Sequence, residues 1–218
     1  MRLIRVMCTG RVDLSFVLRA FSKGADGVFI GGCHLNECNY ITHGNYHTFA
    51  MVQIAKKILA RIGLNPERLT MRFMSGAEAN LFTESVNEFV KTIKELGPLG
   101  KGEGIDEAAL RFRLHSATQL VPYIRLVERE RLRLPPMSEE EYHKIFDSDE
   151  LNRLFKETIV DKLAISQIIA LLREKPLSTA EIAHALGLTP SEVSKYLNSS
   201  SRQRLVRYDE GEKRYAVA

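Results

Sequence analysis

Strand-like apolar runs alternate with amphipathic helical patterns over residues 3–97, and this alternation constrains the fold more than any other feature of the chain. The runs at 3–8, 27–31 and 68–74 are rich in large apolar and β-branched residues. Helical patterns cover 14–22, 48–62 and 75–97, the first with Asp13 as its expected N-cap. Strands that alternate with helices predict a parallel sheet whose strands are joined by right-handed crossovers.

The second half of the chain predicts helices and a small C-terminal module. The glycine-rich stretch 97–104 is typical of a linker, and residues 106–134 and 139–174 have helical patterns with mixed charge. Two capped helices meet at Gly187, and a hairpin follows around residues 209–212, an order that resembles a winged helix.

These patterns predict an α/β fold class and three regions. A small parallel sheet flanked by helices is expected over 1–98, a charged and mostly helical linker over 99–150, and a winged helix-turn-helix domain over 151–218.

Charge and hydropathy exclude few partners. The formal net charge of +4 and the isoelectric point near 9.0 are too weakly basic to indicate nucleic acid by themselves. We find no apolar stretch of membrane-spanning length and no signal-peptide core. The chain contains three cysteines, which do not make a secreted disulfide framework. We therefore expect a soluble cytoplasmic protein without a membrane partner.

The three cysteines follow two of the predicted strands. Cys8 ends the first strand, Cys33 follows the second, and Cys38 lies in the loop after it. The carboxyl ends of parallel strands form one edge of a sheet, where ligands collect. Thiolates gathered there suit a soft metal or an iron–sulfur cluster. Buried, unreactive cysteine is the competing interpretation, because free cysteine is often a core residue.

A zinc site is a second interpretation of the same region. Cys33, Cys38, His43 and His47 supply the two sulfur and two nitrogen ligands that zinc accepts. Only four residues separate Cys38 from His43, however, and a zinc finger usually has about a dozen between its ligand pairs. In this interpretation Cys8 takes no part.

A longer pattern carries a resemblance to a known family. The segment "RVMCTGRVDLSFVLRAFSKGADGVFIGGCHLNECNYITHGNY" resembles the delta subunit of the methyl-viologen-reducing hydrogenase, an iron–sulfur subunit that links hydrogenases to heterodisulfide reductases. The resemblance covers about residues 4–97. It implies a [2Fe–2S] cluster with Cys8, Cys33 and Cys38 as ligands. It also implies electron transfer to or from a flavin-containing heterodisulfide-reductase-like subunit in an anaerobic redox complex.

The chain departs from that family at one position. A [2Fe–2S] cluster takes four ligands, and the family has a further cysteine in an opening Asn-Trp-Cys strand, whereas this chain has three cysteines and no tryptophan. Our hypothesis is that the sequence is truncated at its N-terminus, as would follow if an upstream selenocysteine codon were taken for a stop. The alternatives are a fourth ligand from another group and a degraded site. His34, beside Cys33, is a candidate donor to a cluster sulfur.

No arrangement of residues in the sequence indicates catalysis. We find no nucleophile with a base, no phosphate loop and no paired carboxylates. The expected role is electron transfer within an oxidoreductase complex. The alternative is a metal- or redox-sensing DNA-binding regulator that uses the predicted recognition helix and the basic residues beside it: Ser191, Ser194, Lys195, Tyr196, Asn198, Arg202, Arg204 and Arg207.

Overall fold

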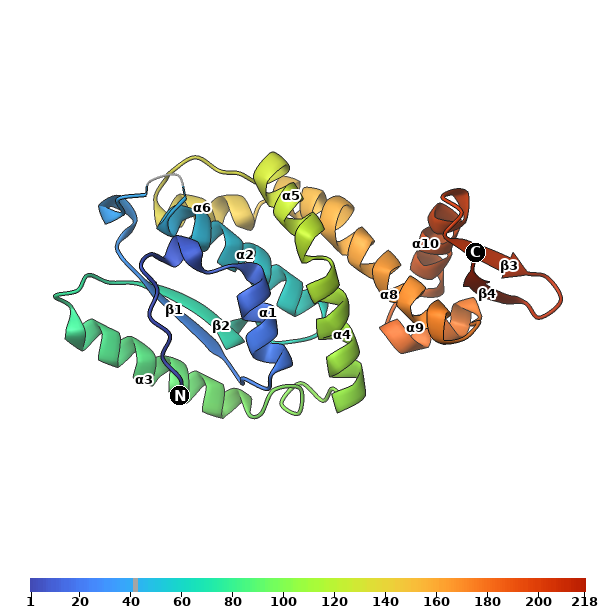
Figure 1. Cartoon of the computed structure of the whole chain (residues 1–218), viewed down its shortest axis with the longest axis horizontal. Coiled ribbons are helices and arrows are strands. Elements are labelled where there is room, and N and C mark those ends of the chain that lie inside the picture. The colour runs from blue at the N-terminus through green and yellow to red at the C-terminus, as the bar shows by residue number, and fades with distance from the viewer. Residues whose placement is uncertain (41–42) are drawn as a thin grey trace. The chain divides into compact units, whose positions relative to one another are not determined.

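The computed structural model describes residues 1–40 and 43–218 (Figure 1). The chain divides into two compact units, Met1–Asn152 and Arg153–Ala218. Two positions of the predicted loop after the second strand, 41 and 42, lie outside the described residues. The division of the chain into domains at 98 and 150 remains a prediction.

A two-stranded parallel sheet lies at the centre of the N-terminal unit. Strand β1, Val28–Gly32, pairs with β2, Leu69–Phe73, in a register that sets Val28 opposite Leu69 and Gly32 opposite Phe73. The connection between them runs through helix α2, Asn45–Arg61, which packs on β2 (Figure 1). A parallel pair requires such a crossover, as the alternating pattern predicted.

The two faces of the sheet are covered by different helices. Ile30 and Met71 are buried on the face toward α2, where Phe73 meets Phe49 with ring centroids 5.3 Å apart. On the opposite face, Phe29 contacts Phe89 of helix α3, Ala79–Leu96. Successive strand residues point to opposite faces, which explains how β1 serves both layers.

Helix α1, Leu14–Ser22, packs against α2 and against helix α4, Glu107–Gln119. Its N-cap is Asp13, whose carboxylate accepts the N–H of Ser15 at 2.8 Å, so the predicted cap is confirmed. Helices α5, Val121–Arg131, α6, Glu139–Phe146, and α7, Asp149–Phe155, follow α4.

The predicted first strand, residues 3–8, is wrong. The segment has no strand assignment, and in the described part of the chain β1 pairs with β2 only. Leu3, Ile4 and Met7 are 78%, 82% and 97% exposed, so their side chains add nothing to the core. An apolar run indicates only that a segment can be buried, and forming a strand also requires a partner with free backbone hydrogen-bonding groups.

Helix α3 leaves part of its apolar side uncovered. Phe89 and Ile93 are half-buried, whereas Phe82 and Val90 are more than a third exposed. The helix therefore covers one face of the sheet with a stripe narrower than its sequence pattern predicts.

A buried ion pair fixes the segment that follows α3. Arg68, in the short turn Pro66–Arg68 before β2, is fully buried, and its Nε donates to Glu103 Oε1 at 2.5 Å. The same guanidinium donates to the carbonyl oxygens of Asp26 at 3.0 Å and Gly97 at 2.9 Å. Burial acts to raise the pKa of Glu103, but Arg68 and the backbone N–H groups of Asn65 and Gly100 together outweigh it, so the pKa lies below its usual value. The stretch predicted as a linker is thus held firmly against the sheet.

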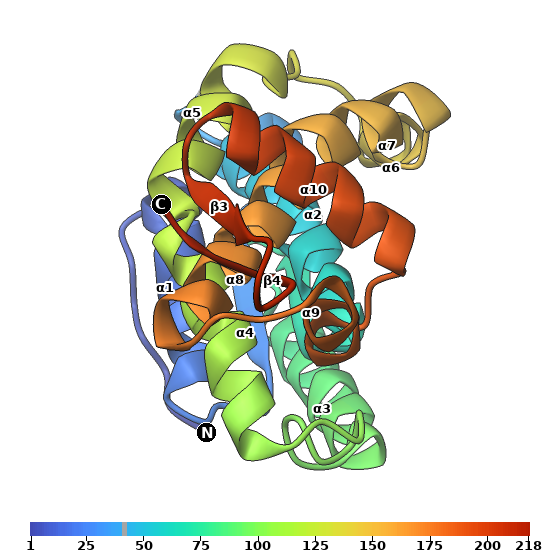
Figure 2. The same ribbon diagram turned by 90° about the vertical axis from the view of Figure 1, so that its right-hand side faces the viewer.

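The C-terminal unit is a winged helix, as the sequence predicted. Its helices are α8, Asp161–Glu174, α9, Thr179–Leu186, and α10, Pro190–Arg202, and a π-helical turn, Lys156–Val160, precedes α8. The antiparallel hairpin of β3, Val206–Asp209, and β4, Arg214–Val217, contacts α10 and α8 (Figure 2).

Local signals set the ends of these helices. Ser178 and Thr189 each form a capping box, with Glu181 and Glu192 respectively. Gly187 ends α9 with a φ of 65°, a conformation that glycine adopts without steric cost. The fold class is therefore confirmed as a small parallel sheet with helices and a C-terminal winged helix. Across residues 1–40 and 43–218, no helix has the length and apolar character needed to cross a membrane.

Candidate iron–sulfur site

Cys8 lies where the extended N-terminal segment turns into the body of the unit. It is the N-cap of a short 3₁₀ turn, Thr9–Arg11, and its sulfur accepts the N–H of Gly10 at 3.4 Å. Gly10 lies so close to the backbone of His43 and Gly44 that an added Cβ would overlap with it. This close approach brings Cys8 toward the loop that contains Cys38.

Cys33 follows directly after β1 and is held by Asn45. The amide nitrogen of Asn45 donates to the carbonyl oxygens of Cys33 at 2.9 Å and His34 at 2.7 Å, and it lies 3.6 Å from the Cys33 sulfur. Asn45 is fully buried at the first position of α2. The sequence patterns did not assign it a role, although the Gly-Asn pair that precedes an amphipathic helix was a usable signal.

Cys38 is the most buried of the three thiols, with 8% of the residue exposed. Burial acts to raise its pKa, but the backbone N–H groups of Asn45 and Tyr40 stabilise the thiolate, so the pKa of Cys38 lies below its usual value. The N–H of Asn45 belongs to the first turn of α2, where the helix dipole also favours negative charge.

The three thiols are neighbours. Burial raises the pKa of Cys33, and Cys38 and Cys8 raise it further because thiolates close together repel. All three cysteines line one surface hollow of about 630 Å³, with Val6, Met7 and Phe82 on its apolar side. The prediction that Cys8 lies at the end of a strand is wrong. Cys8 reaches the hollow as the N-cap of the turn Thr9–Arg11.

The donor set fits an iron–sulfur cluster better than a single metal ion. Among the described residues, no three His, Cys, Asp or Glu side chains are grouped closely enough to hold one ion. A cluster with two irons spreads its sulfur ligands over a wider site, and thiolates that accept N–H donors are its usual ligands. Three thiols in one hollow therefore suit three of its four ligand positions. The role of Cys8, Cys33 and Cys38 as ligands remains a prediction.

His34 has a carboxylate partner. Its Nε2 lies 2.7 Å from Glu78 Oε2, and the same carboxylate oxygen accepts the N–H of Ser75 at 2.6 Å. The hydrogen bond to Glu78 raises the pKa of His34. The loop after β1 is thereby fastened to the loop before α3, on the side of the hollow that Glu78 lines.

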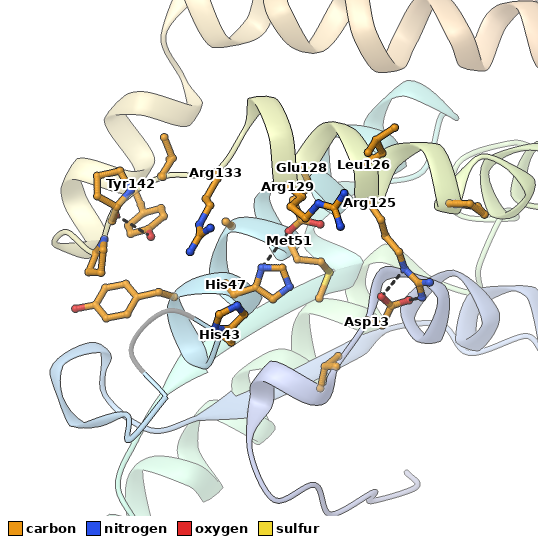
Figure 3. A pocket seen from close by; sticks show the side chains of 17 residues that line it. Asp13, His43, His47, Met51, Arg125, Leu126, Glu128, Arg129, Arg133 and Tyr142 are labelled. Atoms are coloured by element: carbon orange, nitrogen blue, oxygen red, sulfur yellow. Dashed lines mark hydrogen bonds and ion pairs between the residues drawn. The ribbon is translucent and has the colours of Figure 1, made fainter.

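The zinc interpretation finds no support in the geometry. Cys33 and Cys38 line the thiol hollow, whereas His43 and His47 line a second cavity of about 730 Å³ (Figure 3). Among the residues that the structure describes, no three of these side chains are close enough together to hold one ion.

The second cavity contains a buried carboxylate. Glu128 is 9% exposed, and its Oε1 lies 3.5 Å from His47 Nδ1 without forming a hydrogen bond. Burial raises the pKa of Glu128 to about 7, with a further contribution from Asp13 and opposition from Arg125. Burial also lowers the pKa of His47, so near neutral pH both groups tend toward their uncharged forms.

This carboxylate makes stability depend on pH. The pKa of Glu128 in the folded protein, about 7, is above the reference value of 4.5. The contribution of Glu128 to the free energy of unfolding is therefore fully present below pH 4.5 and is lost as the pH rises through 7. Glu128→Gln removes that titration. On moving from pH 4.5 to 8, we expect Glu128→Gln to gain on the order of 1–3 kcal/mol in unfolding free energy relative to the parent, measured by urea unfolding.

Exposed Glu84 provides the control for this measurement, since Glu84→Gln should follow the pH dependence of the parent. His47 titrates in all three proteins, so its contribution largely cancels in the comparison. Parallel pH curves for the parent and Glu128→Gln would show that Glu128 is ionised at pH 5 in the folded protein.

The predicted recognition helix is α10, and its residues differ in exposure. Tyr196 is 3% exposed and its hydroxyl donates to Asp161 at 2.9 Å, so it belongs to the core and not to a DNA-facing surface. Lys195 is ion-paired with the same carboxylate at 3.0 Å. The remaining candidates are exposed: Ser191, Ser194, Asn198, Arg202, Arg204 and Arg207.

The structure defines the class as a small α/β domain with three thiols in one hollow, followed by a winged helix. Residues 1–97 match the family described as methyl-viologen-reducing hydrogenase, delta subunit, and residues 166–208 match the bacterial regulatory protein arsR family. The chain belongs to the methyl-viologen-reducing hydrogenase delta subunit family. The resemblance seen in the sequence is therefore confirmed.

Similar proteins come from Methanococcus and Methanosarcina species. The chain is 50% identical over 97 residues to the vhu iron-sulfur subunit of the F420-non-reducing hydrogenase of Methanococcus maripaludis, covering 44% of this chain and 72% of that protein. It is 46% identical over 99 residues to a subunit of the ferredoxin/F420H2-dependent CoB-CoM heterodisulfide reductase of Methanosarcina acetivorans. That match covers 45% of this chain and 12% of that much longer protein.

Proposed function

We propose that the protein is an electron-transfer subunit whose Cys8, Cys33 and Cys38 hold a [2Fe–2S] cluster. The observation that carries the proposal is the meeting of three thiols in one hollow, within a domain 50% identical to a protein named an iron–sulfur subunit. The fourth ligand is a group other than these three cysteines. When bound, such a cluster supplies one-electron chemistry.

The chain's own residues prepare the site for negative charge. The N–H of Gly10 donates to the sulfur of Cys8, and the N–H groups of Tyr40 and Asn45 stabilise the thiolate of Cys38. Donors to cysteine sulfur stabilise a more electron-rich site and so raise its reduction potential. The side chain of Asn45 holds the backbone at Cys33 and His34 in place.

The apolar rim of the hollow suits a partner subunit. Met7 and Phe82 line it, and the nearby Leu3 and Ile4 are largely exposed. Apolar side chains gathered at a redox site favour contact with another protein, which shortens the path for an electron. The proposed partner is a flavin-containing heterodisulfide-reductase-like subunit in a cytoplasmic complex, and turnover would belong to that partner and not to this chain.

Iron and sulfide analysis tests the proposal. Full-length protein purified without oxygen should contain equal amounts of iron and acid-labile sulfide, with an electron paramagnetic resonance signal on reduction. Cys8→Ala, Cys33→Ala and Cys38→Ala should each lose most of both elements. Met7→Ala, beside Cys8 and 97% exposed, is the matched control and should keep them. Zinc without sulfide in the parent protein would overturn the cluster.

A second candidate function is DNA binding by the winged helix. The match of residues 166–208 to the arsR regulators favours it, as do the exposed side chains of α10 and the exposed hairpin arginine Arg207. A gel shift whose affinity falls steeply with salt would support this function. Arg207→Glu should abolish the shift, whereas absence of any shift at low salt would remove the regulator from consideration.

A further inference from the structure

The second cavity lies where the family domain meets the helices that follow it. Its floor comes from the first turns of α2, with Tyr46, His47 and Met51, and its wall comes from α5 and the proline pair at 135–136 (Figure 3). The family match ends at residue 97, so more than half of this lining is supplied by sequence outside the matched domain. The cavity is therefore a feature that the family resemblance does not explain.

Three arginines face the cavity from one side. Arg125, Arg129 and Arg133 are spaced by four residues, a spacing that aligns side chains along a helix, although Arg133 follows the last residue of α5. Arg125 is held by Asp13, with its Nε 2.8 Å from Oδ2, and Arg129 Nε donates to Glu130 at 2.8 Å. Arg133 has no ion pair within the described residues.

The charge of the lining favours an anion. Arg125 and Arg129 are paired with Asp13 and Glu130, Arg133 has no ion pair within the described residues, and the pKa of Glu128 is about 7, so positive charge is in excess at neutral pH. The ion pair of Arg129 with Glu130 is made through Nε, so its two terminal nitrogens are left to donate to a ligand. Arg129 and Arg133 together present a fork of N–H donors that suits a phosphate group.

The cavity also contains an unused acceptor. Glu128 is nine-tenths buried and lines the cavity; its Oε1 is enclosed, lies 3.5 Å from His47 Nδ1 and makes no hydrogen bond within the described part of the chain. The carboxylate therefore has acceptor capacity left for a hydroxyl or amine of a bound molecule that reaches its exposed edge.

Apart from His43 and His47, the rest of the lining is mainly apolar, and the space is of ligand size. Tyr46, Met51 and Tyr142 line its inner part, and Leu126 and Pro135 line it nearer the solvent. A volume of about 730 Å³ falls in the range of roughly 300–1,000 Å³ typical of small-molecule sites. The space therefore fits an apolar or aromatic body as well as a charged group.

We propose that this cavity binds an organic phosphate of mononucleotide size. The phosphate lies against Arg129 and Arg133, a hydroxyl donates to the Glu128 carboxylate, and the ring lies on the apolar lining from Tyr46, Met51 and Leu126. The proposal is independent of the cluster, since none of these residues lines the thiol hollow.

Calorimetric titration of the full-length protein tests it, with AMP, adenosine and inorganic phosphate as probes. AMP should bind with submillimolar affinity, and adenosine and phosphate should each bind at least about tenfold more weakly, because each lacks one of the two recognised parts. Arg133→Ser should weaken AMP binding about tenfold. Arg131→Ser is the matched control, because Arg131 is exposed at the end of α5 and does not line the cavity.

Three outcomes would overturn the proposal. The first is no AMP binding by the parent protein at millimolar concentration. The second is equal loss of affinity in Arg131→Ser and Arg133→Ser, which would indicate general electrostatic attraction. The third is equal binding of adenosine and AMP, which would mean that the arginines do not recognise the phosphate. Circular dichroism of each variant verifies that a loss of binding is not a loss of fold.

Discussion

Arg68→Met is expected to lower the free energy of unfolding of the N-terminal unit by about 3–5 kcal/mol. Arg68 is fully buried, and the substitution leaves the Glu103 carboxylate, whose side chain is 10% exposed, without its counter-charge. It also removes the donors to the carbonyl oxygens of Asp26, Leu96 and Gly97. Each buried acceptor left without a donor adds its own cost. Urea unfolding with hydrogen exchange at the β2 amides measures the effect.

Two further variants separate this ion pair from general effects of charge removal. Arg111→Met breaks an exposed pair with Glu107 on α4 and should cost no more than about 0.5 kcal/mol. Arg68→Met combined with Glu103→Leu removes both charges and should recover part of the loss, because no uncompensated carboxylate remains. A loss below about 1 kcal/mol for Arg68→Met alone would contradict a stabilising role for the buried Arg68–Glu103 ion pair.

Gly44→Ala is expected to abolish most iron binding while leaving the secondary structure intact. Gly44 is the N-cap of α2, and an added Cβ would overlap with the sulfur of Cys38 and the carbonyl oxygen of Tyr40. Cys38 would have to leave its position beside the N–H of Asn45. The buried thiol should then react faster with a thiol reagent in the metal-free protein, a measurement that does not depend on the cluster.

Gly76→Ala is the matched control for Gly44→Ala. Gly76 lines the same hollow, and an added Cβ there meets nothing within 4 Å. It should load iron and protect its thiols as the parent does. If Gly44→Ala loads iron normally and keeps Cys38 protected, the close contact between Gly44 and Cys38 does not determine the site.

Local signals predicted most of the N-terminal elements. Asp13 before an apolar stripe predicted α1 and its cap, and the short runs at 27–31 and 68–74 predicted β1 and β2 to within about a residue. Helix α2 begins at Asn45, three residues earlier than predicted, because its first residue is buried by contacts to Cys33 and His34 that are distant in sequence. The wrong strand at 3–8 has the same origin, since pairing is not a local property.

The site was predicted less completely than the fold. The sequence drew attention to Cys8, Cys33 and Cys38, but spacing along the chain does not determine which loops come together. The contacts of Gly10 with the backbone at 43–44, and of Asn45 with Cys33, depend on tertiary packing. The second cavity is lined by residues from 12 to 142, each ordinary in its own segment, so no local pattern marks it.

The first turn of α2 contacts Cys33 of the thiol hollow and also lines the second cavity. Asn45 is bonded beside Cys33, and His47, two residues later, lines the arginine-rich cavity. Because a helical turn moves as a rigid piece, displacement at one of these residues is felt at the other. By thermodynamic reciprocity, a molecule that changes cluster binding at the thiols through this turn has its own affinity changed by the same factor when the cluster is bound. Cluster binding at the thiols and ligand binding in the second cavity would thus both act on the first turn of α2.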